Sequence, residues 1–335
     1  MSEPTENFVR HDPPTELPPV EPPSARFIVQ LFVIPAAIVI VLVVAYVAFV
    51  QLPFGRLANG GRDVMDYVRS IKGSNENRRW RSAYELASLI QNDGRLAKDG
   101  NLLGELTVAL DGELAKPKLE NPELAEYLAL SLGAFQTTKS NPVDGRSTDP
   151  IATLSNALGP KQPRTVRVAA AISLSRLAER AGGSFGDPTA VHALAAASAS
   201  AEDSAVRQRA SYALGYFSGD EALAALRRRM SDEEDRVVYY NAGAALARRG
   251  DPEAARVLKE MLSPADLAQT LKASTPSETQ TAIEAVELEA LWGLQASVTS
   301  HPDLTIAVKP QLETLAKTAA PAVRIEAQNL LKKLP

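Results

Sequence analysis

The segment Asp203-Ser-Ala-Val-Arg-Gln-Arg-Ala-Ser-Tyr-Ala-Leu214 holds the pattern that decides the fold of this chain. Within it, Val206, Ala210 and Leu214 are spaced four residues apart, so they lie along one face of an α-helix. The alanine is small enough to let a neighbouring helix approach closely, while the valine and the leucine fill the space on either side of it. The segment therefore predicts a helix that packs tightly between other helices.

The same order of an apolar residue, a small residue and a leucine occurs in four other segments. The five sets are Val166/Ala170/Leu174, Val206/Ala210/Leu214, Val238/Ala242/Leu246, Val286/Ala290/Leu294 and Val323/Ala327/Leu331. Successive sets begin 40, 32, 48 and 37 residues apart, which is around the length of a helical hairpin. Leu124/Leu128/Leu132 and residues 77–90 are weaker copies. The repetition predicts an all-α solenoid of about seven helical hairpins over residues 62–334.

Three Gly-Asp pairs support this division into hairpins. They are Gly186-Asp187, Gly219-Asp220 and Gly250-Asp251. Glycine accepts the left-handed conformation that ends a helix, and aspartate can accept hydrogen bonds from the free amides at the start of the next helix. Pro188 and Pro252 then stand at the first helical position, where proline is tolerated.

At this point the chain resembles the HEAT-repeat family, and within it the short bacterial repeats called phycobilisome-lyase-like or E/Z-type. The resemblance is carried by Val166-Arg167, Val206-Arg207 and Val323-Arg324 with the Ala and Leu that follow each pair, and by Asp203. It implies a solenoid of HEAT-like hairpins whose second helices line the concave face. The family contains scaffolds, adaptors and a few enzymes. The chain departs from the pattern at Tyr239 and Glu287, where the arginine is missing, and between Ser263 and Thr281, where one unit is longer.

A second feature is an apolar stretch near the N-terminus. No residue from Phe27 to Gly55 is ionisable, and residues 38–44 are aliphatic throughout. A helix needs roughly 20 apolar residues to cross the hydrocarbon core of a bilayer. Residues 27–52 therefore predict a single transmembrane helix. A cleaved signal peptide is the alternative, but its apolar core would be only about 7–15 residues long and would follow a basic segment.

The flanks of this stretch predict how the chain is oriented. Residues 1–26 are rich in proline and acidic residues, which predicts a disordered tail. Lysines and arginines are more frequent on the C-terminal flank, from Arg56 to Lys72, than on the N-terminal flank. Because positive charge is retained inside, we expect the solenoid in the cytoplasm, anchored to the plasma or inner membrane.

The composition argues against most chemical functions. The chain has no cysteine, which excludes disulfides and thiolate metal sites, and its net charge of −4 lacks the basic excess of a nucleic-acid-binding protein. None of its three histidines is paired with glutamate as in the HEAT-like deoxyhypusine hydroxylases, so no iron site is expected. Residues 182–186 match G-x-S-x-G, but a nucleophile elbow needs a preceding strand, whereas Ala169–Ala181 predicts helix. We predict no catalytic, cofactor or metal site.

One group of residues is typical of a protein-interaction surface. Tyr212 and Tyr216 are one helical turn apart, and Tyr239 and Tyr240 begin the equivalent helix of the next repeat. Arg207 and Arg209 lie beside them in the sequence. Tyrosine and arginine give large contact areas and directed hydrogen bonds, so we predict a contact site for a partner protein here. The alternative is that the tyrosines fill gaps between repeats.

The basic cluster after the apolar stretch has two interpretations as well. Its residues are Arg78, Arg79, Trp80 and Arg81. They could contact lipid headgroups, or they could be solvated in the ordinary way with the tryptophan in the first hairpin.

These features together predict a membrane-anchored scaffold or adaptor that binds another protein and is not an enzyme. One alternative is an accessory subunit of an integral, transporter-like membrane complex, in which the apolar helix packs against other spans. A lyase-like enzyme is a third interpretation, and it rests on the family resemblance alone.

Overall fold

The computed structural model describes residues 63–334 except residues 74, 118, 120–121, 184, 200–202, 233 and 273. The predicted tail (residues 1–26) and the predicted transmembrane helix (residues 27–52) lie outside the described residues. Among the helices that are described, none combines the length and the apolar character needed to cross a membrane. Residues Asp63–Pro335 form a unit of their own.

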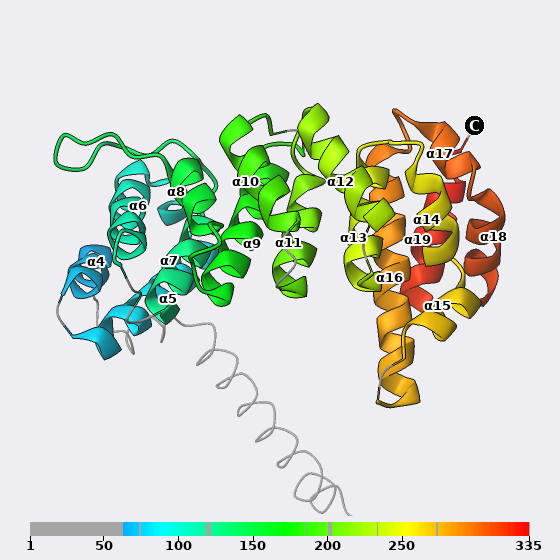
Figure 1. Ribbon diagram of the computed structural model, residues 1–335, viewed down its shortest axis with the longest axis horizontal. Helices are drawn as coiled ribbons and strands as arrows, with labels where there is room; N and C mark the ends of the chain where they lie inside the picture. Colours follow the sequence, from blue (N-terminus) through cyan, green and yellow to red (C-terminus); the bar gives the residue numbers. More distant parts are fainter. Residues whose placement is uncertain are drawn as a thin grey trace, which may run out of the picture. The chain divides into compact units, whose positions relative to one another are not determined.

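This unit consists of helical hairpins stacked in two layers (Figure 1). The first helices of the hairpins make an outer layer: α4 (Val64–Lys72), α6 (Gly100–Leu114), α8 (Pro150–Ala157), α10 (Pro188–Ser198), α12 (Asp220–Asp232) and α14 (Ala254–Met261), followed by α17 (Pro302–Ile306) and α18 (Lys309–Thr318). The second helices make an inner layer: α5 (Glu76–Asn92), α7 (Pro122–Leu132), α9 (Arg164–Arg180), α11 (Ser204–Leu214), α13 (Arg236–Arg248), α16 (Pro276–Ser297) and α19 (Pro321–Leu331). Each inner helix packs on the next inner helix along the chain. The predicted all-α solenoid is confirmed for the part of the chain that the structure describes.

The small residue of the repeated pattern lies in the interior of each inner helix that carries it. All five central alanines are completely buried: Ala170, Ala210, Ala242, Ala290 and Ala327. Most of their valine and leucine partners are buried too, with two exceptions. In α16 Val286 is only partly buried, and Glu287 lies in the interior beside it. In α19 Leu330 is fully buried whereas Leu331 is partly buried, so the last leucine of the pattern is displaced by one position.

The Val-Arg pair of the pattern has a structural role in α9. The side chain of Arg167 is buried, and its Nε donates a hydrogen bond of 3.1 Å to the carbonyl oxygen of Leu158, just after the end of α8. A charged donor therefore satisfies a carbonyl that the helix leaves without a partner. At the matching position of α16, Glu287 cannot donate such a bond.

The turns follow the predicted Gly-Asp pattern in part. Gly219 and Gly250 have positive φ angles of 101° and 69°, which favour glycine. The side chain of Asp187 accepts a hydrogen bond of 2.9 Å from the amide of Ala190 and thereby caps α10. Asp251 is buried and pairs with Arg227 at 2.7 Å, which joins the turn before α14 to α12. The turns thus fix the hairpins as well as ending the helices.

The longer unit between Ser263 and Thr281 contains an additional helix. This helix, α15 (Pro264–Thr270), lies between α14 and α16. A capping box formed by Thr275 and Glu278 then begins α16, the longest helix of the described residues. The insertion therefore lengthens the connection between the two layers without interrupting the stacking of the inner helices.

Candidate protein-interaction site

Two of the predicted tyrosines lie together on the inner layer. The rings of Tyr212 and Tyr216 are 5.4 Å apart at an angle of 62°, and their hydroxyl oxygens are 2.8 Å apart. Tyr216 is buried and Tyr212 is half-buried. Burial raises the pKa of the Tyr216 hydroxyl above its ordinary value of 10.0, so the group stays protonated and keeps its hydrogen bond at physiological pH.

The arginine that accompanies these tyrosines is Arg248, the last residue of α13. Its guanidinium carbon lies 4.2 Å from the ring centroid of Tyr216 and 5.2 Å from that of Tyr212. These are cation–π distances. Its Nη2 donates a hydrogen bond of 3.2 Å to Glu289 of α16, so three inner helices meet at one side chain. Arg248 is 9% exposed, and its Nη1 has no hydrogen-bond partner among the described residues.

The other two predicted tyrosines belong to the interior. Tyr239 and Tyr240 are 6% and 1% exposed, and Arg236 lies over both rings at 4.5 and 5.3 Å. The hydroxyl of Tyr240 donates a hydrogen bond of 2.6 Å to Glu260 of α14, and Arg236 pairs with the same carboxylate. This cluster joins α13 to α14 across the two layers. Tyr239 and Tyr240 therefore fill the space between helices, as the alternative interpretation expected.

The predicted arginines of α11 are not the ones that contact the tyrosine pair. Arg207 is half-buried and Arg209 is exposed. The guanidinium that lies over the rings of Tyr212 and Tyr216 is that of Arg248. The structure thus brings Tyr212 and Tyr216 together with an arginine of the following repeat.

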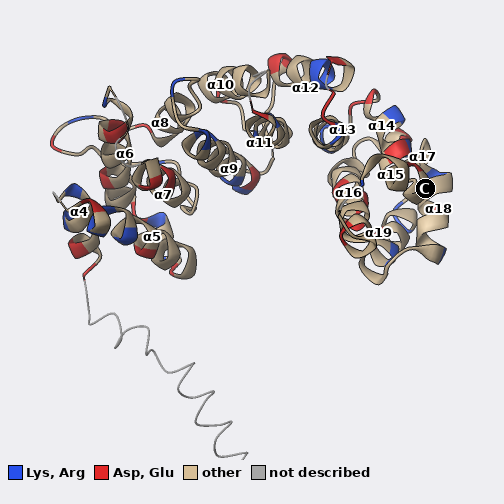
Figure 2. Cartoon of the chain, turned by 60° about the horizontal axis from the view of Figure 1, so that its bottom comes forward, with Lys and Arg blue, Asp and Glu red and all other residues tan. Residues whose placement is uncertain are grey.

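A cavity of about 610 Å³ opens beside the tyrosine pair. It is lined by Glu179, Gly182, Gly183, Tyr212, Tyr216, Arg248, Trp292 and Ala296. These residues come from α9, α11, α13 and α16 or from the turns that follow them, and Figure 2 shows these four inner helices in succession along the array. We call this space the inner-layer cavity.

The most exposed aromatic side chain at the cavity is Trp292, which the sequence analysis did not single out. It is 50% exposed, and within the described residues its indole makes no hydrogen bond and no ring contact. The repeat pattern contains a signal for it, because Ile172, Tyr212, Ala244 and Trp292 all stand two residues after the central alanine of their helix. When the residues at this position are compared between repeats, Trp292 is the largest side chain among them.

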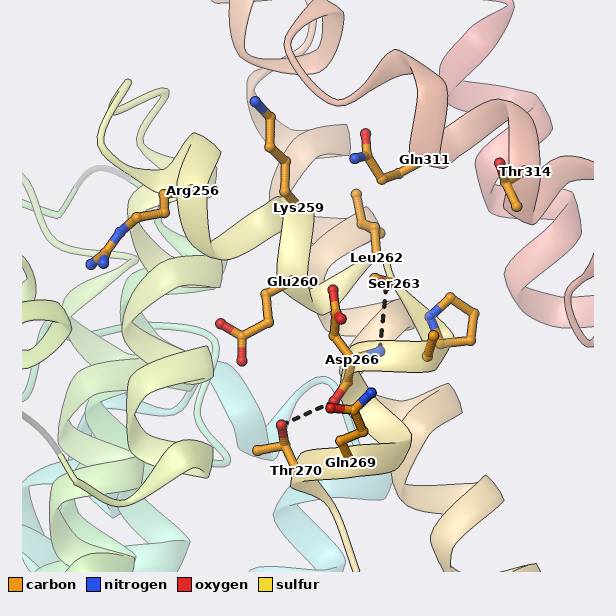
Figure 3. A pocket seen from close by; sticks show the side chains of 12 residues that line it. Arg256, Lys259, Glu260, Leu262, Ser263, Asp266, Gln269, Thr270, Gln311 and Thr314 are labelled. Atoms are coloured by element: carbon orange, nitrogen blue, oxygen red, sulfur yellow. Dashed lines mark hydrogen bonds between the residues drawn. The ribbon is translucent and has the colours of Figure 1, made fainter.

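A larger cavity lies among α14, α15 and α18 (Figure 3). Its volume is about 750 Å³, and no aromatic residue lines it. Arg256 points away from the other labelled side chains. The two hydrogen bonds drawn are local to α15 and its cap: the amide of Asp266 donates to the hydroxyl of Ser263, and the hydroxyl of Thr270 donates to the carbonyl oxygen of Asp266. A lining of mixed polar groups without an aromatic anchor is a poorer match to a binding hot spot than the inner-layer cavity.

The basic cluster after the predicted membrane span is partly structural. Arg79 forms an ion pair with the buried Glu113 of α6. Trp80 stacks on Tyr127 of α7 with ring centroids 6.0 Å apart, and it packs against the hydrophobic core. The guanidinium carbon of Arg81 lies 5.4 Å from the ring centroid of Trp80. This arrangement favours the interpretation in which the tryptophan belongs to the first hairpins.

Several residues that the sequence analysis considered for chemical roles can be located in the structure. Among the described residues, no group of three or more His, Asp or Glu side chains is placed to hold a metal ion. His192 is exposed, with its Nδ1 3.1 Å from Glu221. The residues before the G-x-S-x-G segment form helix α9 as predicted, and Ser184 itself lies outside the described residues.

Comparison with known proteins finds a match to a repeat family over part of the chain. Residues 191–275 match the family described as HEAT repeats. The complex of CpcE and CpcF of phycocyanin lyase from Nostoc sp. is 16% identical over 82% of this chain and 95% of that chain, with a TM-score of 0.46. A designed armadillo repeat protein is 14% identical over 82% of this chain and all of its own, with a TM-score of 0.39. Human deoxyhypusine hydroxylase in complex with glycerol is 16% identical over 81% of this chain and 95% of that chain, with a TM-score of 0.29.

No curated protein matches the chain. The family match covers residues 191–275, and this segment contains Tyr212, Tyr216 and Arg248 of the inner-layer cavity.

Proposed function

We propose that this chain is a membrane-anchored HEAT-repeat scaffold or adaptor that binds a protein partner at the inner-layer cavity. The observation that carries the proposal is the half-exposed Trp292 beside a cavity walled by Tyr212, Tyr216 and Arg248. Tryptophan, tyrosine and arginine are the residues that dominate binding energy in protein interfaces, and they act most strongly next to a pocket that excludes water. An exposed tryptophan without a ring partner is the anchor that such an interface needs.

The tyrosine pair supports this proposal because its geometry is fixed before a partner binds. Tyr212 and Tyr216 are held by their mutual hydrogen bond and by Arg248, which is in turn held by Glu289. A partner that docks here loses little entropy in ordering these side chains. The site is therefore suited to recognition rather than to chemistry, and we propose a role without catalysis.

The membrane part of the proposal rests on residues 27–52, whose apolar run is long enough to span a bilayer. In this proposal the anchor lies in the plasma or inner membrane, and the positive flank holds the solenoid in the cytoplasm. The partner would then be recruited to the membrane surface. A transporter-like complex with this chain as an accessory subunit is the alternative, and it is favoured by the same apolar run.

The test is affinity purification of the tagged full-length protein from gently solubilised native membranes, with quantitative mass spectrometry. Trp292→Ala is expected to lower the recovery of a bound partner about tenfold, because the loss of a hot-spot anchor costs more than about 1–2 kcal/mol. Ile306→Ala is the matched control, since Ile306 is 44% exposed, close to the 50% of Trp292, but lies on α17 in the outer layer. Partners that survive Trp292→Ala unchanged would refute the site.

A second comparison separates the scaffold from the accessory subunit. The segment 27–52 is replaced by an unrelated transmembrane helix of the same length. A scaffold keeps its partner after this exchange, because the inner layer makes the contact. An accessory subunit loses its partner, because the native helix packs against other spans.

A further inference from the structure

The inner-layer cavity contains one carboxylate that the protein does not neutralise. Glu179 is exposed on the last turn of α9 and lines the cavity. Within the described residues its carboxylate accepts no hydrogen bond and forms no ion pair. The neighbouring Arg180 is turned toward α7, where its Nη1 donates hydrogen bonds of 2.7 and 2.6 Å to the carbonyl oxygens of Gly133 and Phe135. The carboxylate of Glu179 therefore lines the cavity without a direct ion pair in the described part of the chain, although Arg180 is near enough for a longer-range attraction.

The other charges at the cavity cancel. Arg248 is the only basic residue among those that line it, and Glu289 balances it across 3.2 Å. The wall formed by α16 adds no positive charge, because this helix contains no lysine or arginine (Figure 2). The net charge around the cavity is therefore negative.

The ends of the helices act in the same direction. Glu179, Arg248 and Ala296 each lie in the last turn of an inner helix, and Tyr216 lies just after the end of α11. The carboxyl end of a helix carries a partial negative charge, because its last carbonyl oxygens are free. Four such ends follow one another around the cavity, and together they favour a cation.

The aromatic walls provide a place for that cation. Arg248 already covers one side of the tyrosine pair. The indole of Trp292 has no such occupant, and tryptophan is the ring that attracts cations most strongly. A long basic side chain can place its aliphatic stem along the ring and its charge near a carboxylate.

We propose that the inner-layer cavity receives an arginine or lysine side chain of the partner protein, with its cation on the face of Trp292 and paired with Glu179. This inference rests on the proposed function and adds the chemistry of the partner: a segment that presents a basic residue. Electrostatic complementarity of this kind selects the partner and its orientation.

The test measures binding of a defined probe to the full-length protein in detergent micelles. The chain has two tryptophans, so labelling with 5-fluorotryptophan gives two ¹⁹F resonances, and Trp292→Phe assigns them. The probe is the capped tripeptide acetyl-Ala-Arg-Ala-amide, and the control is the same peptide with citrulline, which has the same shape without the charge. The Trp292 resonance is expected to shift on titration with the arginine peptide and to stay in place with the citrulline peptide, while the Trp80 resonance does not move.

Two variants test the site itself. Glu179→Gln is expected to weaken binding of the arginine peptide about threefold to fivefold, as the loss of a partly exposed ion pair does. Ala296→Phe is expected to abolish the shift by filling the cavity, at a position where the side chain is exposed and folding is undisturbed. Equal shifts with arginine and citrulline, unchanged affinity in Glu179→Gln, or no movement of the Trp292 resonance would each overturn the proposal.

The outcome separates this inference from the proposed function. If Trp292→Ala releases the membrane partner but the arginine peptide does not bind, the scaffold function stands and the basic ligand is wrong. If the peptide binds while every partner survives Trp292→Ala, the cation site is real and the proposed docking function is wrong.

Discussion

The burial of Glu287 makes the stability of the solenoid dependent on pH. This residue is 2% exposed in α16. Loss of hydration on burial, together with the nearby charge of Glu284, raises the pKa of its carboxyl group from an ordinary value of 4.5 to about 7. The substitution Glu287→Gln keeps the size and the polarity of the side chain but removes the titrating proton.

The direction and size of the effect follow from linkage. A carboxyl group with a raised pKa binds its proton more tightly in the folded state than in the unfolded state. Its favourable contribution is therefore complete below pH 4.5 and is lost as the pH rises through about 7. Each pKa unit corresponds to about 1.36 kcal/mol, so the loss at pH 8 has an upper limit of about 3 kcal/mol. Glu287→Gln should be more stable than the parent at pH 8 by about 1–3 kcal/mol and equally stable near pH 4.5.

Urea unfolding of the full-length protein in detergent, followed by circular dichroism at several pH values, measures this difference. All other titrating groups are common to the two proteins, so the difference between their curves isolates Glu287. Glu313→Gln is the matched control, because Glu313 is exposed and lies on α18, away from Glu287 in the sequence. Two curves that run parallel from pH 4.5 to pH 8 would refute the reasoning.

Two further predictions concern the packing around two glycines and the hydrogen bond made by Arg167. Gly133→Ala should destabilise the protein by about 1–3 kcal/mol, because a Cβ atom there would lie 2.6 Å from the Cα of Ser173. Gly112→Ala should instead stabilise α6 by about 0.5–1 kcal/mol, because a Cβ atom there would meet nothing within 4 Å. Thermal unfolding of the two variants tests both predictions, and equal effects would contradict the geometry. Arg167→Met should cost about 2 kcal/mol in urea unfolding, because it leaves the carbonyl oxygen of Leu158 without its charged donor, and a variant as stable as the parent would show that the bond contributes nothing.

The repeated pattern predicted the packing of the inner layer well, because the central alanine is a steric requirement. A side chain larger than that of Ala210 or Ala242 would separate adjacent helices, so the small residue identifies the buried face directly. The valine and the leucine of the pattern predict burial less reliably than the alanine does. A spacing of four residues exceeds the helical period of 3.6, so the residue eight positions on has rotated away from the alanine's face. In α19 Leu330 is buried rather than Leu331, whereas the leucine at this step remains fully buried in the other four helices.

The candidate site was harder to predict than the fold, because its residues come from different repeats. Tyr212 in α11 and Tyr216 just after its end are four residues apart, and this spacing identified the pair. Arg248 and Trp292 come from the next two inner helices, and no local spacing links them to the tyrosines. Tyr239 resembles the other tyrosines in sequence, but only the three-dimensional packing shows that it faces the interior.

The stacking of the repeats sets the dimensions of the inner-layer cavity. In a solenoid each repeat contacts only its neighbours, so the position of α16 relative to α9 is set by the successive contacts through α11 and α13. Small residues set the distance between adjacent helices: Gly215 lies against Ala245, Gly293 lies against Ala244, and Ala210 and Ala242 are completely buried. The separation of Glu179 from Trp292 across the cavity is therefore determined by residues that do not line it. A substitution that enlarges Ala210 or Ala242 should alter binding at the cavity even where the fold survives, because it changes the spacing of the walls.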